Sequence, residues 1–202
     1  SSIYLKQGEK LTLEELLYGL MLRSGNDAAV AVAHHVGGSV PGFVYLMNEK
    51  AALIGMTHTN FTNPHGLDDS NMHYSTAEDM AKLSAYALRN PIFRQIVSTK
   101  VKTISWEGEK WDRRLQNKNK LLHLYNGADG VKTGYTKLAK RCLASSATRD
   151  GRQLAAITLN APDDWNDSMK LLDWGFEHFA VSKVVAKGQT IQANVAAEDP
   201  SL

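Results

Sequence analysis

The sequence predicts an α+β fold with a mostly antiparallel sheet. Apolar residues recur at helical spacing through the first half of the chain, up to about residue 98. From residue 99 the pattern changes to alternation, and turn residues separate the alternating stretches. A last amphipathic stretch follows the strands. A chain in which helices come first, neighbouring strands follow and a last helix covers the sheet is typical of the α+β class.

Five helices are predicted in the first half, over residues 10–25, 28–38, 40–54, 75–89 and 91–98. In the first of them the apolar stripe consists of Leu13, Leu16, Leu17, Leu20 and Met21. Thr12 with Glu15, and Ser75 with Glu78, have the spacing of capping boxes at two helix starts. Residues 1–5 are predicted to form a short strand. Residues 57–75 are polar and too long for a simple connection, which favours a functional loop.

The second half predicts strands and a closing helix. Residues 100–106 and 110–115 flank a turn as in a hairpin, and residues 142–160 form another hairpin around Asp150-Gly151. Residues 164–179 are predicted to be a helix whose buried stripe consists of Met169, Leu172, Phe176 and Phe179. Residues 1–180 therefore form one domain. Residues 181–202 lose the helical period and are interpreted as the start of a C-terminal β segment or a linker.

Composition excludes several classes of protein. With 202 residues, 43% of them hydrophobic and 22% charged, the chain is an ordinary globular domain. A net charge of +2 without a basic stripe argues against nucleic acid as a partner. No histidine or cysteine spacing indicates a metal site, and no cofactor is implied. The single cysteine, Cys142, is predicted to be a small buried strand residue. No apolar run is long enough to cross a bilayer.

Two short motifs carry chemistry. Ser24-Gly25-Asn26 lies in the turn between the first two helices, and Lys132-Thr133-Gly134 opens a predicted strand more than a hundred residues later. S-x-N and K-T-G are two of the three elements of active-site serine enzymes of the penicillin-recognising type. Each triplet alone has an ordinary explanation, because "SGND" also suits a helix N-cap and "KTG" also suits a strand start.

The longer stretches around these motifs extend the likeness. "GEKLTLEELLYGLMLRSGNDAAVAVA", "FTNPHGLDD", "YSTAEDMAKLSAYAL" and "NKNKLLHLYNGADGVKTGYT" occur in this order. Over residues 1–180 the chain resembles the serine-type D-alanyl-D-alanine carboxypeptidases, the low-molecular-weight penicillin-binding proteins of the peptidase S11 type. The resemblance implies a β-lactamase/transpeptidase-like fold, in which helices flank an antiparallel sheet and a helical subdomain adjoins it. It also implies removal of the terminal D-alanine from peptidoglycan stem peptides through a serine acyl-enzyme.

The resemblance assigns roles to the motif residues. Lys132 supplies charge and Thr133 a hydroxyl for the free carboxylate of the substrate, while Gly134 lets an extended peptide lie against the strand. Ser24 passes a proton toward the leaving amine. Asn26 holds the catalytic lysine and the substrate amide, or alternatively caps the helix that begins at Asp27. His65, on the polar loop, either contacts substrate or fixes the loop, and the second is favoured.

The nucleophile motif S-x-x-K is missing from the sequence, because no serine is followed by lysine three residues later. In the resembling family this motif precedes S-x-N by several tens of residues, so both the nucleophilic serine and the basic lysine are expected upstream of residue 1. The chain is then either a piece of the enzyme, associating with its own N-terminal fragment, or a pseudoenzyme. Uncovered apolar helix faces favour the first interpretation.

Two alternative functions remain open. A serine β-lactamase shares the implied fold, but its middle motif is usually S-D-N, where this chain has "SGN". A non-catalytic cell-wall protein that binds D-Ala-D-Ala ends is the alternative from another class. The resemblance implies a secreted or membrane-anchored protein of the bacterial envelope with a role in cell shape, and it implies β-lactam antibiotics as ligands.

Overall fold

A computed structural model describes residues 1–182 of the chain. Five helices form its first half: α1 (Leu13–Arg23), α2 (Asn26–Gly37), α3 (Val40–Leu53), α4 (Ala77–Ala87) and α5 (Pro91–Ser98). The second half holds the hairpin β1 (Val101–Ile104) and β2 (Arg113–Gln116), the short helix α6 (Leu121–Leu124), the strands β3 (Ala128–Thr136), β4 (Lys140–Arg149) and β5 (Arg152–Thr158), and α7 (Asp164–His178). The predicted α+β class is confirmed.

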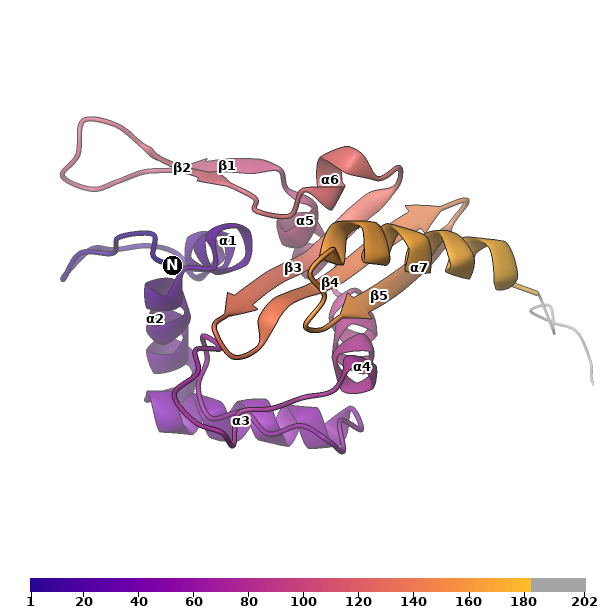
Figure 1. The fold of residues 1–202 in the computed structure, drawn as a ribbon. Coiled ribbons are helices and arrows are strands. Elements are labelled where there is room, and N and C mark those ends of the chain that lie inside the picture. The colour runs from indigo at the N-terminus through magenta and orange to yellow at the C-terminus, as the bar shows by residue number, and fades with distance from the viewer. Residues whose placement is uncertain (183–202) are drawn as a thin grey trace, which may run out of the picture.

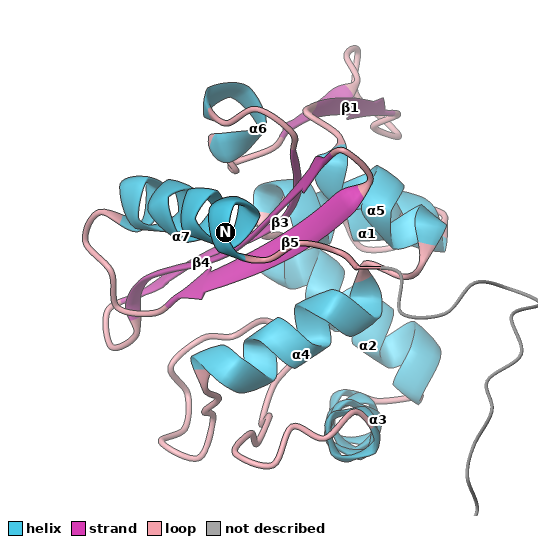
Figure 2. Cartoon of the chain, turned by 90° about the vertical axis from the view of Figure 1, so that its right-hand side faces the viewer, coloured by secondary structure: helices cyan, strands magenta, loops and turns pink. Residues whose placement is uncertain are grey.

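The main sheet is antiparallel with the strand order β3-β4-β5. Helix α7 covers one of its faces, while α4 and α5 pack on the other (Figures 1 and 2). In the α7 layer, Leu172 packs with Leu143 and Ala147 of β4. In the opposite layer, Val97 of α5 packs with Leu88 and with Val131 of β3. The strand that carries Lys132 therefore lies between two apolar layers, and its outer edge pairs with no other described strand.

Several predicted elements differ from the structure at their ends. Ser75 is not the cap of α4, because Thr76 takes that place and accepts a hydrogen bond from the backbone N–H of Asp79 (3.2 Å). Phe179 is 55% exposed, because α7 ends at His178 and the chain turns away there. The K-T-G triplet lies inside β3 rather than at its start, because the strand begins at Ala128. The predicted C-terminal β segment lies almost entirely outside the described residues.

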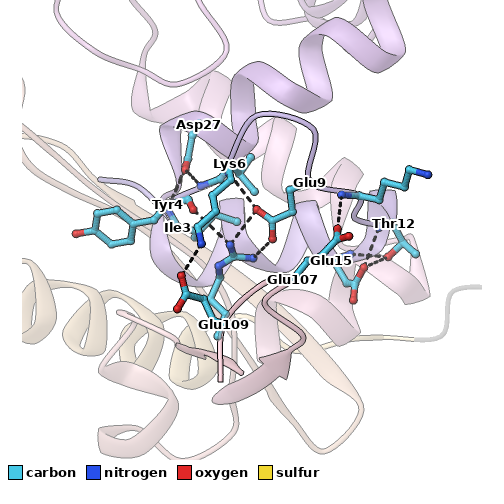
Figure 3. Close-up of polar contacts among 12 residues, drawn as sticks. Ile3, Tyr4, Lys6, Glu9, Thr12, Glu15, Asp27, Glu107 and Glu109 are labelled. Carbon is cyan, nitrogen blue, oxygen red and sulfur yellow. Dashed lines mark hydrogen bonds and ion pairs between the residues drawn. The ribbon is translucent and has the colours of Figure 1, made fainter. Parts of the chain in front are cut away.

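Residues 1–5 do not form the predicted strand. The carboxylate of Asp27, in the first turn of α2, accepts the backbone N–H groups of Ile3 (3.1 Å) and Leu5 (3.0 Å). These donors therefore have a side-chain acceptor and need no neighbouring strand. Figure 3 shows Asp27 at one end of this N-terminal segment and Glu9 at the other. Between them the side chain of Ile3, only 3% exposed, packs with Tyr18 and Leu22 of α1.

A buried ion pair fastens the same segment to the hairpin. Arg113 of β2 and Glu9 have side chains that are only 5% and 4% exposed, and two of their nitrogen–oxygen distances are 2.9 and 3.1 Å. The guanidinium also donates to the carbonyl of Tyr4 (3.4 Å) and lies 4.6 Å from the ring centre of Trp106. On the surface, Lys6 pairs with Glu109 of the hairpin loop (Figure 3). The hairpin and the N-terminal segment therefore stabilise each other.

Loss of one partner of this buried pair leaves an uncompensated charge. We expect Arg113→Met to lower the free energy of unfolding by about 3–5 kcal/mol, because Glu9 would stay buried without its counter-ion. Urea unfolding followed by circular dichroism measures the effect. Arg114→Met on the same strand is the matched control, since Arg114 is exposed and its side chain donates to the side chain of Gln116 on the same strand. Equal stability of the two variants would show that the pair does not hold the segment.

Candidate active site

A cavity of about 760 Å³ runs along the outer edge of β3. Its walls come from parts of the chain that are distant in sequence. They include the N-terminal Ser1, the junction of α1 and α2, the long loop after α3, single residues of α3 and α4, Lys118, the strands β3 and β4, and the start of α7. The residues that bear on its chemistry are Ser24, Asn26, His65, Lys118, Lys132, Thr133, Gly134, Tyr135, Arg141, Cys142, Asp164 and Trp165. The structure thus brings all six sequence-predicted site residues to one cavity.

The α1–α2 junction positions Ser24 and Asn26. Ser24 is the C-cap of α1 and has a left-handed backbone (φ 57°, ψ 44°), which is uncommon for a residue other than glycine. The cap of α2 is Gly25 and makes no side-chain hydrogen bond, so the alternative in which Asn26 caps a helix starting at Asp27 is wrong. Asn26 is instead the first residue of α2. Its backbone N–H donates to the carbonyl of Ser1 (2.9 Å), and the residue lines the cavity.

Lys132 joins the two halves of the site. From β3 its amine donates to the hydroxyl of Ser24 (2.5 Å) and to the carbonyl of Thr133 (2.6 Å). Burial, and secondarily the positive charge of Lys118, lowers the pKa of Lys132 to about 8. Burial acts in this direction because it disfavours the charged form of an amine. An amine with such a pKa can exchange a proton near neutral pH, and the hydroxyl of Ser24 is hydrogen-bonded to it.

Buried polar contacts hold β3 in place around Lys132. The amide of Asn119, which is 1% exposed, donates to the carbonyl of Gly130 (2.9 Å). The carboxylate of Asp129 accepts hydrogen bonds from the hydroxyls of Ser146 and Thr148 on β4, both at 2.6 Å. These contacts lie directly before the K-T-G triplet in the chain. These contacts hold β3 in place, so the position of Lys132 does not depend only on the hydrogen bonds of its own amine.

Gly134 faces Cys142 across the two strands. A Cβ added at Gly134 would lie 3.7 Å from that of Cys142, which is ordinary contact, so packing within the chain does not require glycine there. The same arrangement explains why Cys142 is not buried as predicted. Gly134 has no side chain to cover it, and the partly exposed Cys142 therefore lines the cavity.

His65 lies in a loop organised around Asn63. The Asn63 side chain, 3% exposed, accepts from the backbone N–H groups of His65 (3.2 Å) and Gly66 (2.6 Å) and donates to Asp69 (2.7 Å). Nδ1 of His65 accepts the N–H of Leu67 (3.3 Å). One ring nitrogen of His65 thus holds the loop, while the residue also lines the cavity.

Sequence reasoning did not predict the other six of the cavity residues named above as part of a site: Lys118, Tyr135, Arg141, Cys142, Asp164 and Trp165. The amine of Lys118 donates to the hydroxyl of Ser1 (2.8 Å), and its backbone N–H donates to the carbonyl of Leu22 (3.1 Å). Lys118 belongs to the stretch quoted above around K-T-G but to neither triplet, so the two motifs do not identify it. The position of Arg141 could have been predicted from the sequence, because the start of β4 has to pair with the K-T-G strand that precedes it.

The family is decided by comparison with known proteins. The family model of the D-alanyl-D-alanine carboxypeptidases, peptidase S11, matches residues 1–163. The chain belongs to this family. D-alanyl-D-alanine carboxypeptidase DacF of Bacillus subtilis is 37% identical over 196 residues, which are 95% of this chain and 49% of the relative. DacB2 of Mycobacterium tuberculosis is 38% identical over 178 residues, 85% of this chain and 60% of the relative.

Solved structures agree with the assignment of the fold. The Streptomyces K15 DD-transpeptidase superimposes with a TM-score of 0.81 at 36% identity, over 88% of this chain and 72% of the other. The expected transpeptidase-like fold is therefore confirmed. The chain spans about half the length of curated relatives such as DacF of Bacillus subtilis and DacA of Haemophilus influenzae, 49% and 48% respectively.

The lowered pKa of Lys132 predicts a pH-dependent stability. Unfolded Lys132 keeps its proton up to about pH 10.5, whereas the folded chain releases it above about pH 8. Between these values the unfolded state binds more protons, so the wild type gains stability as the pH rises. We expect the free energy of unfolding of the wild type, minus that of Lys132→Met, to rise by roughly 3 kcal/mol across this range.

Urea titrations at pH 7 and at pH 10 measure this difference. Lys120→Met, which removes an exposed lysine near the same site, controls for the loss of one positive charge. A difference between wild type and Lys132→Met that stays constant with pH would mean that the amine of Lys132 titrates in the folded chain as it does in water.

Proposed function

We propose that this chain is the larger part of the catalytic domain of a D-alanyl-D-alanine carboxypeptidase. The observation that carries the proposal is the contact of the Lys132 amine with the Ser24 hydroxyl, beside the outer edge of β3, which pairs with no other strand among residues 1–182. A poised amine next to a hydroxyl suits proton transfer to a leaving amine. A free strand edge suits an extended peptide, which pairs with the backbone there. Membership of the S11 family points to the same chemistry.

The proposed reaction uses a serine nucleophile and a lysine base upstream of residue 1, since residues 1–202 contain no S-x-x-K. The serine oxygen attacks the carbonyl between the two D-alanines, and the peptide C–N bond breaks as the leaving amine takes a proton. D-alanine departs and an acyl-enzyme remains, which water then hydrolyses. Residues 1–180 are accordingly proposed to be part of one catalytic domain, which associates with that upstream segment.

We infer the roles of the motif residues from the family resemblance, and their places in the cavity support these roles. The hydroxyl of Ser24 relays the proton between Lys132 and the leaving amine. The side chain of Asn26 lines the cavity next to Ser24 and is proposed to bind the upstream lysine and the substrate amide. Thr133 and Gly134 bind the peptide along β3, and glycine is favoured at 134 because a side chain there would stand in the peptide's path. His65 is proposed to contact the substrate from the loop that it holds.

The proposed function also implies where the protein acts in the cell and which ligands it binds. The substrate, a peptidoglycan stem peptide, lies outside the bacterial cytoplasmic membrane, so the protein is proposed to act in the cell envelope, secreted or anchored there, and to influence cell shape. β-Lactam antibiotics are proposed to acylate it. Among residues 1–182, no single helix is long and apolar enough to cross a membrane.

Acylation by benzylpenicillin tests the proposal directly. We expect the full-length protein to gain the mass of one benzylpenicillin, and to release D-alanine from diacetyl-Lys-D-Ala-D-Ala. Intact-mass spectrometry and a D-alanine assay measure the two events. A protein that takes no adduct and releases no D-alanine, but binds the peptide, would support the binding-module alternative. Rapid turnover of penicillin would favour a β-lactamase.

The role of Ser24 has its own test. We expect Ser24→Ala to lower the rate of D-alanine release by about 10²- to 10⁴-fold, because it interrupts proton transfer and leaves the fold intact. Ser98→Ala is the matched control, since the Ser98 hydroxyl donates to the carbonyl of Gln95 within α5 and does not line the cavity. Unchanged turnover in Ser24→Ala would remove Ser24 from the mechanism.

A further inference from the structure

The loop between α3 and α4 is closed at its base by backbone pairing. Asn60 and Tyr74 exchange two backbone hydrogen bonds, each 3.0 Å long, and form an isolated antiparallel bridge. The side-chain amide of Asn60 also donates to the carbonyl of Met72 (2.7 Å). Residues 61–73 therefore form a compact loop whose two ends lie side by side, as in an Ω-loop.

The side chain of His73 extends this closure. Its Nδ1 accepts the backbone N–H of Thr62, on the opposite side of the loop (3.0 Å). The ring of Phe61 packs beside it, with 5.9 Å between the ring centres. Because the donor is a backbone N–H, Nδ1 has to be unprotonated, and the neutral ring carries its proton on Nε2. The contact therefore requires the neutral form of His73.

The His73–Thr62 bond lies next to the residue that organises the loop. Thr62 precedes Asn63, whose side chain is 3% exposed and accepts the backbone N–H groups of His65 (3.2 Å) and Gly66 (2.6 Å). Both His65 and His73 line the cavity. A short path of hydrogen bonds thus leads from the imidazole of His73 through Thr62 and Asn63 to the position of His65.

The surroundings of His73 favour its neutral form. Burial, the largest effect, lowers the pKa of His73 below its ordinary value of 6.5, because a buried imidazole is harder to charge. The charge of His65 acts in the same direction, whereas the carboxylates of Asp69 and Asp68 raise the pKa and offset burial only in part. The other charged side chains around the cavity are those of Lys118, Lys132, Arg141 and Asp164.

Protonation of His73 breaks the contact with Thr62. The new N–H at Nδ1 faces another N–H, so two donors meet without an acceptor. The folded chain binds this proton less tightly than the unfolded chain does, because the pKa is lowered on folding. The contribution of the neutral ring to stability is therefore complete above pH 6.5 and is lost as the pH falls through the lower pKa of the folded state.

We propose that His73 is a positioning residue of the active site, whose neutral imidazole holds Thr62 and Asn63 and through them keeps His65 at the cavity. The assignment rests on the proposed carboxypeptidase function, in which His65 contacts the substrate. His73 acts through the loop and not on the reacting atoms. Acid then weakens catalysis by releasing the loop, and this effect belongs to a residue outside both motifs.

Two replacements of His73 separate hydrogen bonding from titration. His73→Gln keeps an oxygen that can accept the Thr62 N–H but does not titrate, and His73→Leu has no acceptor. In the full-length protein at pH 7.5, we expect His73→Leu to lower kcat/KM for diacetyl-Lys-D-Ala-D-Ala by about five- to tenfold, and His73→Gln to stay within about twofold. As the pH falls from 7.5 to 4.5, the wild type should lose activity relative to His73→Gln.

A double-mutant cycle tests whether His73 acts through His65. His65→Ala removes the proposed substrate contact, so His73→Leu should have little further effect in that background. An equally large loss there would contradict the assignment. His58→Leu is the matched control, because His58 is exposed, contacts the hydroxyl of Thr57 (3.0 Å) and does not line the cavity. It should keep the wild-type activity and pH profile.

Hydrogen exchange follows the loop independently of catalysis. Mass spectrometry of the full-length protein measures the protection of the amides of residues 60–66, corrected for the intrinsic effect of pH on exchange. Between pH 7.5 and 4.5 the wild type should lose protection, His73→Gln should keep it, and His73→Leu should lack it throughout. Equal behaviour of the wild type and His73→Gln overturns the assignment. If the wild type releases no D-alanine, the proposed function fails, whereas the exchange pattern still decides whether His73 holds the loop.

Discussion

The contact between the amine of Lys132 and the hydroxyl of Ser24 ties the helical half of the molecule to its sheet. An amine enclosed by protein needs acceptors that replace water, and here they come from a helix end and from the strand itself. Ser24 meets the amine only because α1 stops there with a left-handed residue. Asn119 and Asp129 hold the other partner, the strand. The end of α1 thus holds one side of this contact, and the contacts of Asn119 and Asp129 hold the other.

The contact between Lys132 and Ser24 lies beside the outer edge of β3, which pairs with no other strand among the described residues. Layers of helices cover both faces of the sheet, so a ligand approaches the strand from the side, between the α1–α2 junction and the start of α7. Such a ligand meets the hydrogen-bonded pair of Lys132 and Ser24 as well as the guanidinium of Arg141, since all three residues line the cavity.

The sequence alone predicted most of the elements, because helical and strand periods are local signals. The first helix, its Thr12–Glu15 capping box and the Asp150-Gly151 hairpin are confirmed. The failures depend on distant partners. Residues 1–5 form no strand, because the Asp27 carboxylate accepts their backbone N–H groups. Thr76, and not Ser75, caps α4. The two motifs identified the cavity. Lys118 and Arg141 also line it, but their positions depend on strand register and packing, which cannot be read from the order of residues.

The Lys132–Ser24 contact joins residues that are 108 positions apart in the sequence. A ribosome adding about 5–20 residues per second needs roughly 5–20 s to make the stretch between them. During that time the helices exist without the strand that completes the cavity. Contacts of such long range form late, because the intervening chain must first be ordered. The cavity can therefore appear only when folding of the chain is almost finished, and binding to it would report a fully folded molecule.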